Sequence, residues 1–414
     1  MDFDIHQYQP TDTLYLWWLG RPERPQLVGT LATVRAFKGV SLRYAASWLK
    51  SGFPLSEDMP LIEGEFLPDA NETAAGAVDD ARPDRWGERV IRFLDKPPRL
   101  SVMEFLFYAG DERFGALGVS LSESSYIARR LGPLPLLADV SAIEILVRRI
   151  LNGEQIDPAQ HRLIAPGGTL GGARPKALLN LDGHPWILKF NEPGESIDMP
   201  LVEHATMTLA AKAGIRVAPT QAIALQTGHA IAIQRFDRQA GQRIHALSAR
   251  VALKAAGEGM GYPELAQLLR RRGVSAEGLH RQQMAELFRR MVFNILMDNT
   301  DDHEKNHALL MNDRGEYALS PAFDVLPSGQ ALGYQQMRVG SQQSDSTIVN
   351  ALSEHPLFGL KAPEAADHVR EVVRVVANWK EHFASTGVSW GDIESLARQI
   401  DRPFLQDQRA SWGI

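Results

Sequence analysis

Cysteine is absent from the 414 residues of this chain, so neither a disulfide framework nor a thiolate metal site can form. A reducing compartment suits such a chain. The sequence also lacks an uninterrupted apolar run that could span a bilayer, because the stretch 131–146 is broken by two prolines and two acidic residues. The first ten residues lack the charged and apolar regions of a secretory signal. These absences predict a soluble, cytoplasmic protein without a membrane segment.

A strong net charge is also missing. The 44 basic and 50 acidic residues leave a formal charge of −6, which argues against a broad basic surface that binds nucleic acid unaided. Hydrophobic residues at 44% and charged residues at 23% are ordinary for a soluble globular protein. Because 414 residues exceed one ordinary core, we expect two or three packed units.

The first third of the chain contains short apolar segments separated by turns. Residues 13–19, 27–31 and 40–44 have strand-like patterns, which predicts a small antiparallel sheet. Residues 71–83, rich in Ala, Gly and Asp, are expected to form a surface loop. No catalytic spacing occurs in this part, so we interpret it as a scaffold or docking module.

A glycine-rich stretch, residues 166–176, precedes two strand-like segments joined by Asp182-Gly183, which is a strong hairpin signal. Glycines let backbone N–H groups approach phosphate oxygens closely. The stretch matches neither the Walker A pattern nor the dinucleotide-binding fingerprint, so its interpretation depends on the residues that follow.

Lys189 is the one cation of an apolar strand, residues 186–190. A buried lysine needs an anionic partner, and the phosphates of ATP together with a helix glutamate would supply one. Glu203, near the start of the helical run 201–213, is the candidate glutamate. The alternative is a lysine at a strand edge with its ammonium group in solvent.

Two more strands, residues 222–225 and 230–233, lead to Gln234, Arg235 and Phe236. Backbone groups at this junction could read the adenine edge, as the linker between the lobes of protein kinases does.

A polar cluster follows the helix-periodic apolar residues between Met284 and Ile295. Apolar periodicity buries one helix face, so the cluster at the helix end has a rigid support. Asp301 and Asn306 form D-x-x-x-x-N, the spacing of the catalytic Asp and the metal-binding Asn in protein kinases. Asp324, 23 positions after Asp301, lies near where a kinase carries its second magnesium ligand.

The same cluster offers two alternatives. His303 to His307 spell H-E-x-x-H, the zinc metalloprotease signature, which requires both histidines on one face of a helix. The preceding residues 299–302 favour caps and turns over helix interiors, which argues against that motif. The other alternative is a polar helix-to-loop junction without chemistry.

Helical patterns dominate the second half, at residues 262–272, 282–298, 365–383 and 390–400. Strands followed by helices predict an α+β, two-lobed, protein-kinase-like fold. We expect an N-terminal β-rich subdomain at residues 1–125, a mixed β/α ATP-binding lobe at 126–236 and a mostly α-helical catalytic lobe at 237–414.

The whole chain resembles the HipA-like serine/threonine kinases, toxins of bacterial toxin–antitoxin pairs. The resemblance is carried by residues 28–31, 47–49, 54–56, 110–111 with 115–117, 172–176, 186–190, 235–238, 300–306 and 323–325. The departures are Arg174-Pro175 in place of Gln-Glu, and residues 245–249 in place of a His-Gln-Glu-Asp stretch.

The resemblance implies roles for the candidate residues. Asp301 would be the catalytic base, Asn306 and Asp324 the magnesium ligands, Lys189 the phosphate-binding lysine, and His303 a residue of the catalytic loop that is structural or near the phosphates. Further contacts to ATP would come from Gly171, Gly172, Ala173, Lys176, Glu203, Gln234, Arg235 and Phe236. Thr169 falls where these kinases carry a regulatory serine, whose phosphorylation ejects the glycine-rich loop and switches the kinase off.

The resemblance also implies ATP and Mg²⁺ as cofactors and a small helix-turn-helix antitoxin, HipB-like, as partner, with operator DNA bound mainly through the antitoxin. Known substrates in the family are aminoacyl-tRNA synthetases, whose phosphorylation halts translation and is linked to persistence. The alternative from another class is a non-catalytic corepressor that acts through the antitoxin.

Overall fold

The computed structural model describes residues 8–129, 132–165 and 172–413, which form two compact units. The first unit comprises Met1–Pro193, Gln234–Ala256 and Leu310–Gly315, and the second comprises Gly194–Ile233, Gly257–Leu309 and Glu316–Ile414. The chain therefore leaves the first unit after Pro193 and returns to it at Gln234. The three domain ranges expected from the sequence remain a prediction.

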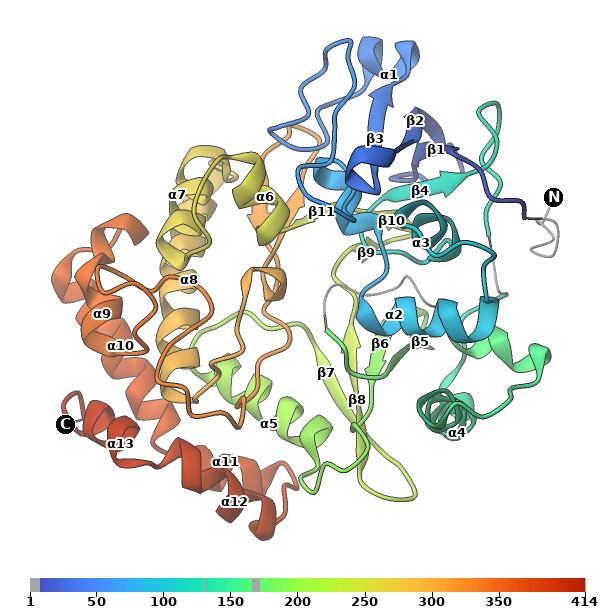
Figure 1. The fold of residues 1–414 in the computed structure, drawn as a ribbon. Helices are drawn as coiled ribbons and strands as arrows, with labels where there is room; N and C mark the ends of the chain where they lie inside the picture. Colours follow the sequence, from blue (N-terminus) through green and yellow to red (C-terminus); the bar gives the residue numbers. More distant parts are fainter. Residues whose placement is uncertain (1–7, 130–131, 166–171, 414) are drawn as a thin grey trace. The chain divides into compact units, whose positions relative to one another are not determined.

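The first unit is built on an antiparallel sheet with the strand order β3-β2-β1-β4 (Figure 1). The central strand β1 buries Leu14 and Leu16 completely, and α3 packs on the sheet. The predicted small antiparallel sheet is confirmed. The helices and strands of this unit are β1 (Thr13–Trp18), β2 (Gln26–Val34), β3 (Gly39–Tyr44), α1 (Ala46–Ser51), α2 (Arg85–Val90), α3 (Val102–Tyr108), β4 (Leu117–Ser120), α4 (Val140–Asn152), β5 (Lys176–Leu181), β6 (His184–Lys189), β9 (Arg238–Gln239), β10 (Gln242–Arg243), β11 (His245–Ser248) and α6 (Ala249–Ala255).

Residues 71–83 are not the surface loop expected from their composition. They contain the 3-10 helix Gly76–Ala81, in which Ala77 and Val78 are at most 1% exposed. The carboxylate of Asp80 accepts hydrogen bonds from the backbone N–H and the hydroxyl of Ser248, at 2.6 and 2.8 Å. The expectation was wrong because the small side chains pack closely here, and because Asp80 binds the residue that caps α6.

The hairpin β5–β6 confirms the Asp182-Gly183 signal. Both turn residues have positive φ, 52° and 80°, as a tight hairpin turn with the twist of its strands requires. In the resulting register Lys176 lies directly opposite Lys189, so both lysines project from the same face of the hairpin.

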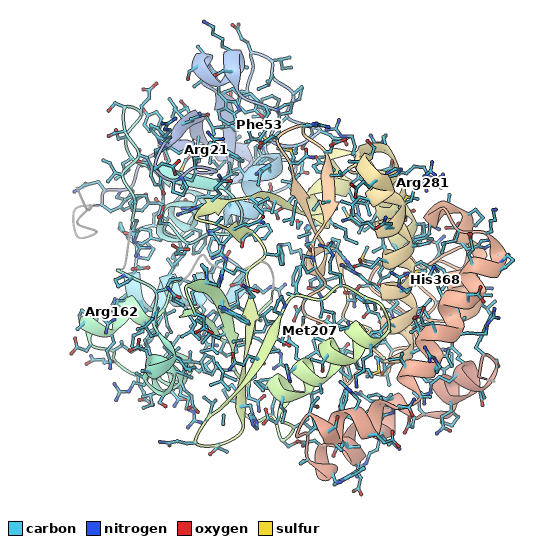
Figure 2. The ribbon with its side chains drawn as sticks, turned by 180° about the vertical axis from the view of Figure 1, so that it is seen from behind. Arg21, Phe53, Arg162, Met207, Arg281 and His368 are labelled. Carbon is cyan, nitrogen blue, oxygen red and sulfur yellow. The ribbon has the colours of Figure 1, made fainter. Side chains whose placement is uncertain are left out.

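His245 is buried in the first unit, between the rings of Trp18 and Phe53, whose centroids lie 5.5 and 6.0 Å away (Phe53 is labelled in Figure 2). Its Nε2 donates a hydrogen bond to the carbonyl oxygen of Leu55 at 2.8 Å. Burial lowers the pKa of His245 to about 4, so the folded protein holds this imidazole in its neutral form at pH 7.

This histidine should make stability depend on pH. In the unfolded chain it binds a proton at about pH 6.5, so its contribution is fully present above that pH and is lost as the pH falls toward 4. We expect the free energy of unfolding of the wild type, measured relative to that of His245→Phe, to fall by about 3 kcal/mol between pH 7 and pH 4. Urea unfolding at a series of pH values measures this difference. A constant difference would contradict the assignment, and the exposed His184, changed to Gln, serves as the control.

The second unit is organised around the long helix α8, which packs against α7 and α10 (Figure 1). Its elements are α5 (Met199–Lys212), β7 (Thr220–Ala224), β8 (His229–Gln234), α7 (Tyr262–Arg272), α8 (Leu279–Leu296), β12 (Ala308–Met311), β13 (Tyr317–Leu319), α9 (Ile348–Ser353), α10 (Ala362–Val376), α11 (Trp379–Ser385), α12 (Trp390–Ile400) and α13 (Pro403–Ala410), with β8 and β12 extending across the boundary between the units. Among the described residues, no helix is long and apolar enough to cross a membrane.

One helical prediction in this unit was wrong in extent. Residues 365–383, expected as one helix, lie in two helices, α10 and α11, separated at Ala377 and Asn378. The side chain of Asn378 donates to the carbonyl oxygen of Arg374 at 2.9 Å and thereby competes with the helical backbone bonds.

Candidate functional site

The polar segment between α8 and β12, residues 297–307, is fixed at its beginning by Asp298. This residue lies two positions after the end of α8 and has a positive φ of 54°, and its carboxylate accepts a hydrogen bond from Arg402 at 2.8 Å. Its carbonyl oxygen accepts from the backbone N–H of Ser328 at 3.1 Å. Burial raises the pKa of Asp298 to about 6 in spite of the nearby guanidinium group. The chain therefore leaves α8 in a defined direction.

Asp301 and Asp302 have opposite environments. Asp301 is exposed, whereas Asp302 is 2% exposed and accepts hydrogen bonds from His307 Nε2, at 2.8 Å, and from the hydroxyl of Tyr262. Burial alone would raise the pKa of Asp302, but its interaction with His307 and the hydrogen bond from Tyr262 outweigh burial and keep this pKa below its ordinary value. Asp302 is thus an ionised anchor, and the adjacent Asp301 is accessible to a substrate.

His303 caps a short 3-10 helix, Glu304–Asn306, by accepting a hydrogen bond at Nδ1 from the backbone N–H of Lys305 at 3.2 Å. Asn306 is 6% exposed, and His307 has the extended φ and ψ angles −119° and 135°. Because the two histidines do not share a helix, the geometry that the zinc metalloprotease motif requires is absent from this segment.

Asp324 has a positive φ of 59° and is half-buried. A left-handed conformation costs a non-glycine residue about 1–3 kcal/mol and is concentrated at functional sites. Ala322, two positions before Asp324, holds the chain in place, since its N–H donates to Arg216 O at 2.8 Å and its carbonyl accepts from Ala218 N at 2.9 Å. The strain at Asp324 favours a functional role for this carboxylate.

One small void of about 10 Å³ lies in the second unit beside the candidate residues. Asn306 lines it, as do Asp302 and Phe323, the chain neighbours of Asp301 and Asp324. The structure therefore places Asn306 at the void, and places Asp301 and Asp324 each one residue along the chain from its lining. Glu203, on α5 of the same unit, is 2% exposed.

The two lysines of the β5–β6 hairpin lie in the first unit and are both buried, Lys176 at 4% and Lys189 at 8% exposure. Like charges directly opposite each other on a hairpin are unfavourable without anions. Lys176 forms an ion pair with Asp84, with Nζ and Oδ2 2.7 Å apart. Sequence reasoning missed Asp84, which is 92 positions away. If Lys176 contacts phosphate as the sequence predicts, its ammonium group would have to bind the phosphate and Asp84 at the same time.

The glycine-rich stretch is described from Gly172 onward. Gly172 and Ala173 are exposed, and Gly172 has a positive φ of 94° that other residues rarely adopt. Two sequence-predicted residues, Thr169 and Gly171, lie outside the described residues.

Arg235 proves to be a structural residue of the first unit. Its N–H donates to Pro185 O at 3.1 Å, so this group is already used within the protein. Its guanidinium group, 1% exposed, binds Asp237 and the carbonyl oxygens of Glu112 and Arg113. The adenine-reading role of Gln234, Arg235 and Phe236 remains a prediction, and sequence reasoning gave no sign of this buried network.

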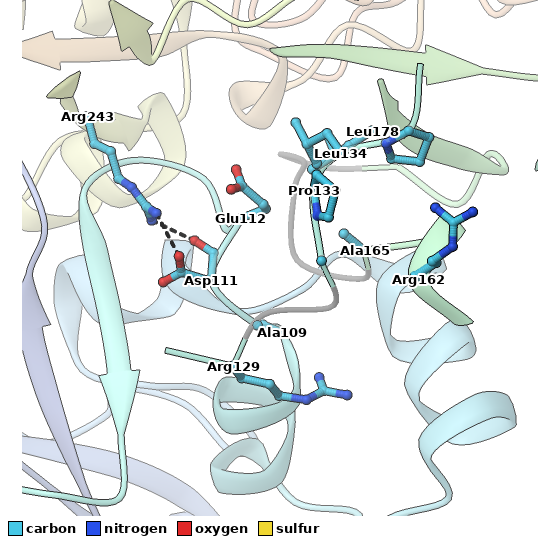
Figure 3. Close-up of a pocket in the computed structure, with 13 residues that line it drawn as sticks. Ala109, Asp111, Glu112, Arg129, Pro133, Leu134, Arg162, Ala165, Leu178 and Arg243 are labelled. Carbon is cyan, nitrogen blue, oxygen red and sulfur yellow. Dashed lines mark hydrogen bonds and ion pairs between the residues drawn. The ribbon is translucent and has the colours of Figure 1, made fainter. Parts of the chain in front are cut away.

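A larger cavity of about 530 Å³ lies within the first unit (Figure 3). Its wall is apolar at Pro133, Leu134 and Leu178. The lining residue Arg243 forms an ion pair with Asp111 at 3.0 Å, drawn as a dashed line in Figure 3. The size suits a small ligand, but this arginine is already paired, so the cavity by itself indicates no ligand class.

Comparison with known proteins identifies the family. Residues 168–379, more than half of the chain, match the HipA-like C-terminal domain, and residues 24–120 match the HipA N-terminal domain. The chain belongs to the HipA family. The sequence resemblance is thereby confirmed for both parts of this HipA family member.

Two relatives from Sinorhizobium fredii are named as kinases. Y4mE is 25% identical over 340 residues, which cover 76% of each protein. Y4dM is 32% identical over 160 residues, which cover 35% of this chain and 37% of Y4dM. Among solved structures, HipA of Shewanella oneidensis MR-1, determined with HipB and operator DNA, has a TM-score of 0.64 at 17% identity and covers 96% of this chain and 97% of that one. This likeness confirms the predicted α+β HipA-like fold.

Proposed function

We propose that this HipA family member is an ATP- and magnesium-dependent protein serine/threonine kinase that acts as a bacterial toxin. The observation that carries the proposal is the arrangement around the 10 Å³ void, which Asn306 lines together with Asp302 and Phe323, the chain neighbours of Asp301 and Asp324. The kinase names of Y4mE and Y4dM support it.

The chemistry of the donors fits magnesium. An aspartate carboxylate and an asparagine carbonyl are hard oxygen ligands of the kind that Mg²⁺ prefers, so Asp324 and Asn306 would hold it. When bound, the ion would neutralise charge on the transferring phosphoryl group. The exposed Asp301 would orient and deprotonate the acceptor hydroxyl. Lys189 would bind phosphate oxygens, and the buried Glu203 remains the candidate for the helix glutamate of a kinase.

The proposed partners follow from the family. A HipB-like helix-turn-helix antitoxin would neutralise the kinase and carry it to operator DNA, and the S. oneidensis structure, which contains HipA, HipB and operator DNA, supports this proposal. We further propose a translation factor such as an aminoacyl-tRNA synthetase as the substrate. Incubating the purified protein with radiolabelled ATP and cell lysate, then identifying the labelled band, tests the substrate proposal, and copurification with the antitoxin tests the partner proposal. Antitoxin binding without any labelled protein would favour the corepressor alternative.

The metal proposal makes a prediction for Asp324. Nucleotide binding should require Mg²⁺, and Asp324→Ala should weaken it about tenfold or more, a loss of about 1.4 kcal/mol, because a charged oxygen ligand is removed. Calorimetric titration with ATP, with and without Mg²⁺, measures the effect. Asp313→Ala, which removes an exposed carboxylate from a turn, is the matched control. Equal affinities for wild type and Asp324→Ala would exclude this ligand.

We also propose that Thr169 is a phosphorylation switch. A phosphate on this residue would add about −1.5 to −2 charges in the glycine-rich stretch and would repel ATP. Incubation with magnesium-ATP should raise the intact mass of the wild type by one phosphate, and Thr169→Ala should show no gain. An equal gain in the variant would place the modification elsewhere.

A further inference from the structure

We propose that His307 is a positioning residue for phosphoryl transfer and that it acts together with Asp302 and one bound water molecule. This inference rests on the proposed function. In this arrangement His307 and Asp302 hold the two ends of the segment 301–306, so that Asp301 and Asn306 keep a fixed separation. Neither His307 nor Asp302 would touch the nucleotide.

The first observation is a continuous chain of buried hydrogen bonds in the second unit. Asn299 Nδ2 donates to Asn294 Oδ1 at 3.1 Å, and Asn294 Nδ2 donates to the hydroxyl oxygen of Tyr262 at 3.3 Å. That hydroxyl donates to Asp302 Oδ2, which also accepts from His307 Nε2 at 2.8 Å. All five side chains are at most 3% exposed. The chain of bonds ties α7 and α8 to both ends of the segment.

The second observation is the position of the pair in the sequence. Asp302 directly follows Asp301, and His307 directly follows Asn306. The contact between Asp302 and His307 therefore closes residues 302–307 into a loop, with Asp301 just outside the closing bond and Asn306 just inside it. Without that bond, the distance between Asp301 and Asn306 would no longer be fixed, while α7 and α8 would remain packed.

The third observation concerns protons. Asp302 Oδ2 can only accept, so Nε2 of His307 carries a hydrogen, and Nδ1 of a neutral ring is then an acceptor. Among the described residues, no group bonds His307 Nδ1 or Arg290 Nη1, although both atoms are buried. Both residues line the void of about 10 Å³.

A void of this size holds about one water molecule, provided that polar partners surround it. Arg290 is a donor only, and His307 Nδ1 is an acceptor, so one water can accept from the first and donate to the second. Asn306 lines the same void. The water would therefore connect His307 and Arg290 to Asn306, the proposed magnesium ligand.

Two variants separate this role from ordinary packing. His307→Gln retains an amide donor that can reach Asp302, whereas His307→Phe retains the ring shape without a donor. The measured quantity is the affinity for a non-hydrolysable ATP analogue in the presence of Mg²⁺ divided by the affinity in the presence of EDTA. His307→Phe is expected to lower this ratio at least tenfold, while its affinity for the analogue without metal stays within twofold of the wild type. His307→Gln should keep most of the wild-type ratio. An unchanged ratio in His307→Phe, or an equal loss in both variants, would overturn the proposal. If His307→Phe does not fold, Tyr262→Phe removes the other donor to Asp302 and should lower the same ratio.

A second readout does not depend on the proposed function. Nitrogen-15 NMR of the histidine rings, with His307→Gln as the assignment control, reports which ring nitrogen carries the proton. We expect the Nε2–H form for His307 in the wild type, with its proton protected from exchange. An Nδ1–H form would overturn the inference. Absence of magnesium-dependent nucleotide binding in the wild type, with the Nε2–H form present, would instead count against the proposed function.

Discussion

Replacing Asp301 with alanine is expected to lower phosphoryl transfer by about 10²–10⁴-fold while ATP affinity stays within a few fold. The exposed Asp301 acts on the acceptor hydroxyl in the transition state, so its loss should affect turnover more than binding. Transfer of ³²P from labelled ATP and calorimetric titration with magnesium-ATP measure the two quantities. Asp313→Ala, at another exposed aspartate, should behave as the wild type in both.

The same variant separates the two functional classes in the cell. Expression of the wild type should slow growth, because the proposed kinase would halt translation, and expression of Asp301→Ala should not. Equal growth inhibition by both proteins would point to a non-enzymatic role, such as corepression through the antitoxin.

Replacing Asp237 with alanine is expected to cost about 3–5 kcal/mol of stability, the range for breaking a buried ion pair by removal of one partner. Its carboxylate, 2% exposed in the first unit, accepts hydrogen bonds from Arg235 and Arg238 and from the N–H of Gly115 at 2.8 Å. Although burial opposes ionisation, the two guanidinium groups keep the pKa of Asp237 well below its usual range. Without it, two buried cations lose their main anion.

Urea unfolding at pH 7 measures this loss, again with Asp313→Ala as the control, since Asp313 belongs to the same unit but is exposed. Asp237→Asn keeps the shape of the side chain and removes its charge. Its loss of stability should therefore lie between those of Asp237→Ala and Asp313→Ala. A cost below about 1 kcal/mol for Asp237→Ala, the value typical of an exposed ion pair, would contradict this account.

Features with local causes could be predicted from the sequence. The Asp182-Gly183 turn determines the β5–β6 hairpin through two positive φ angles, and the helix expected at residues 262–272 is found with the same ends. The spacing of Asp301 and Asn306 located the catalytic candidates because a short segment after a buried helix leaves little conformational freedom.

Features that depend on distant partners could not be predicted. Asp237 meets Gly115, 122 positions upstream, and Asp80 meets Ser248, 168 positions downstream. No local pattern of charge or hydrophobicity encodes such pairs. The same limit explains why Lys176 was interpreted as a ligand-binding cation without its partner Asp84.

The return of the chain to the first unit at Gln234 has a consequence for synthesis on the ribosome. Asp80 and Gly115 find their partners only when residues 237–248 have been translated. At a translation rate of about 5–20 residues per second, these segments are synthesised roughly 6–25 s after Ser120, the last residue of the N-terminal sheet. During that interval the surface of the 3-10 helix Gly76–Ala81 that packs against β11 and α6 is uncovered and open to chaperones, so a gene fragment that ends before Gln234 should yield an aggregating product.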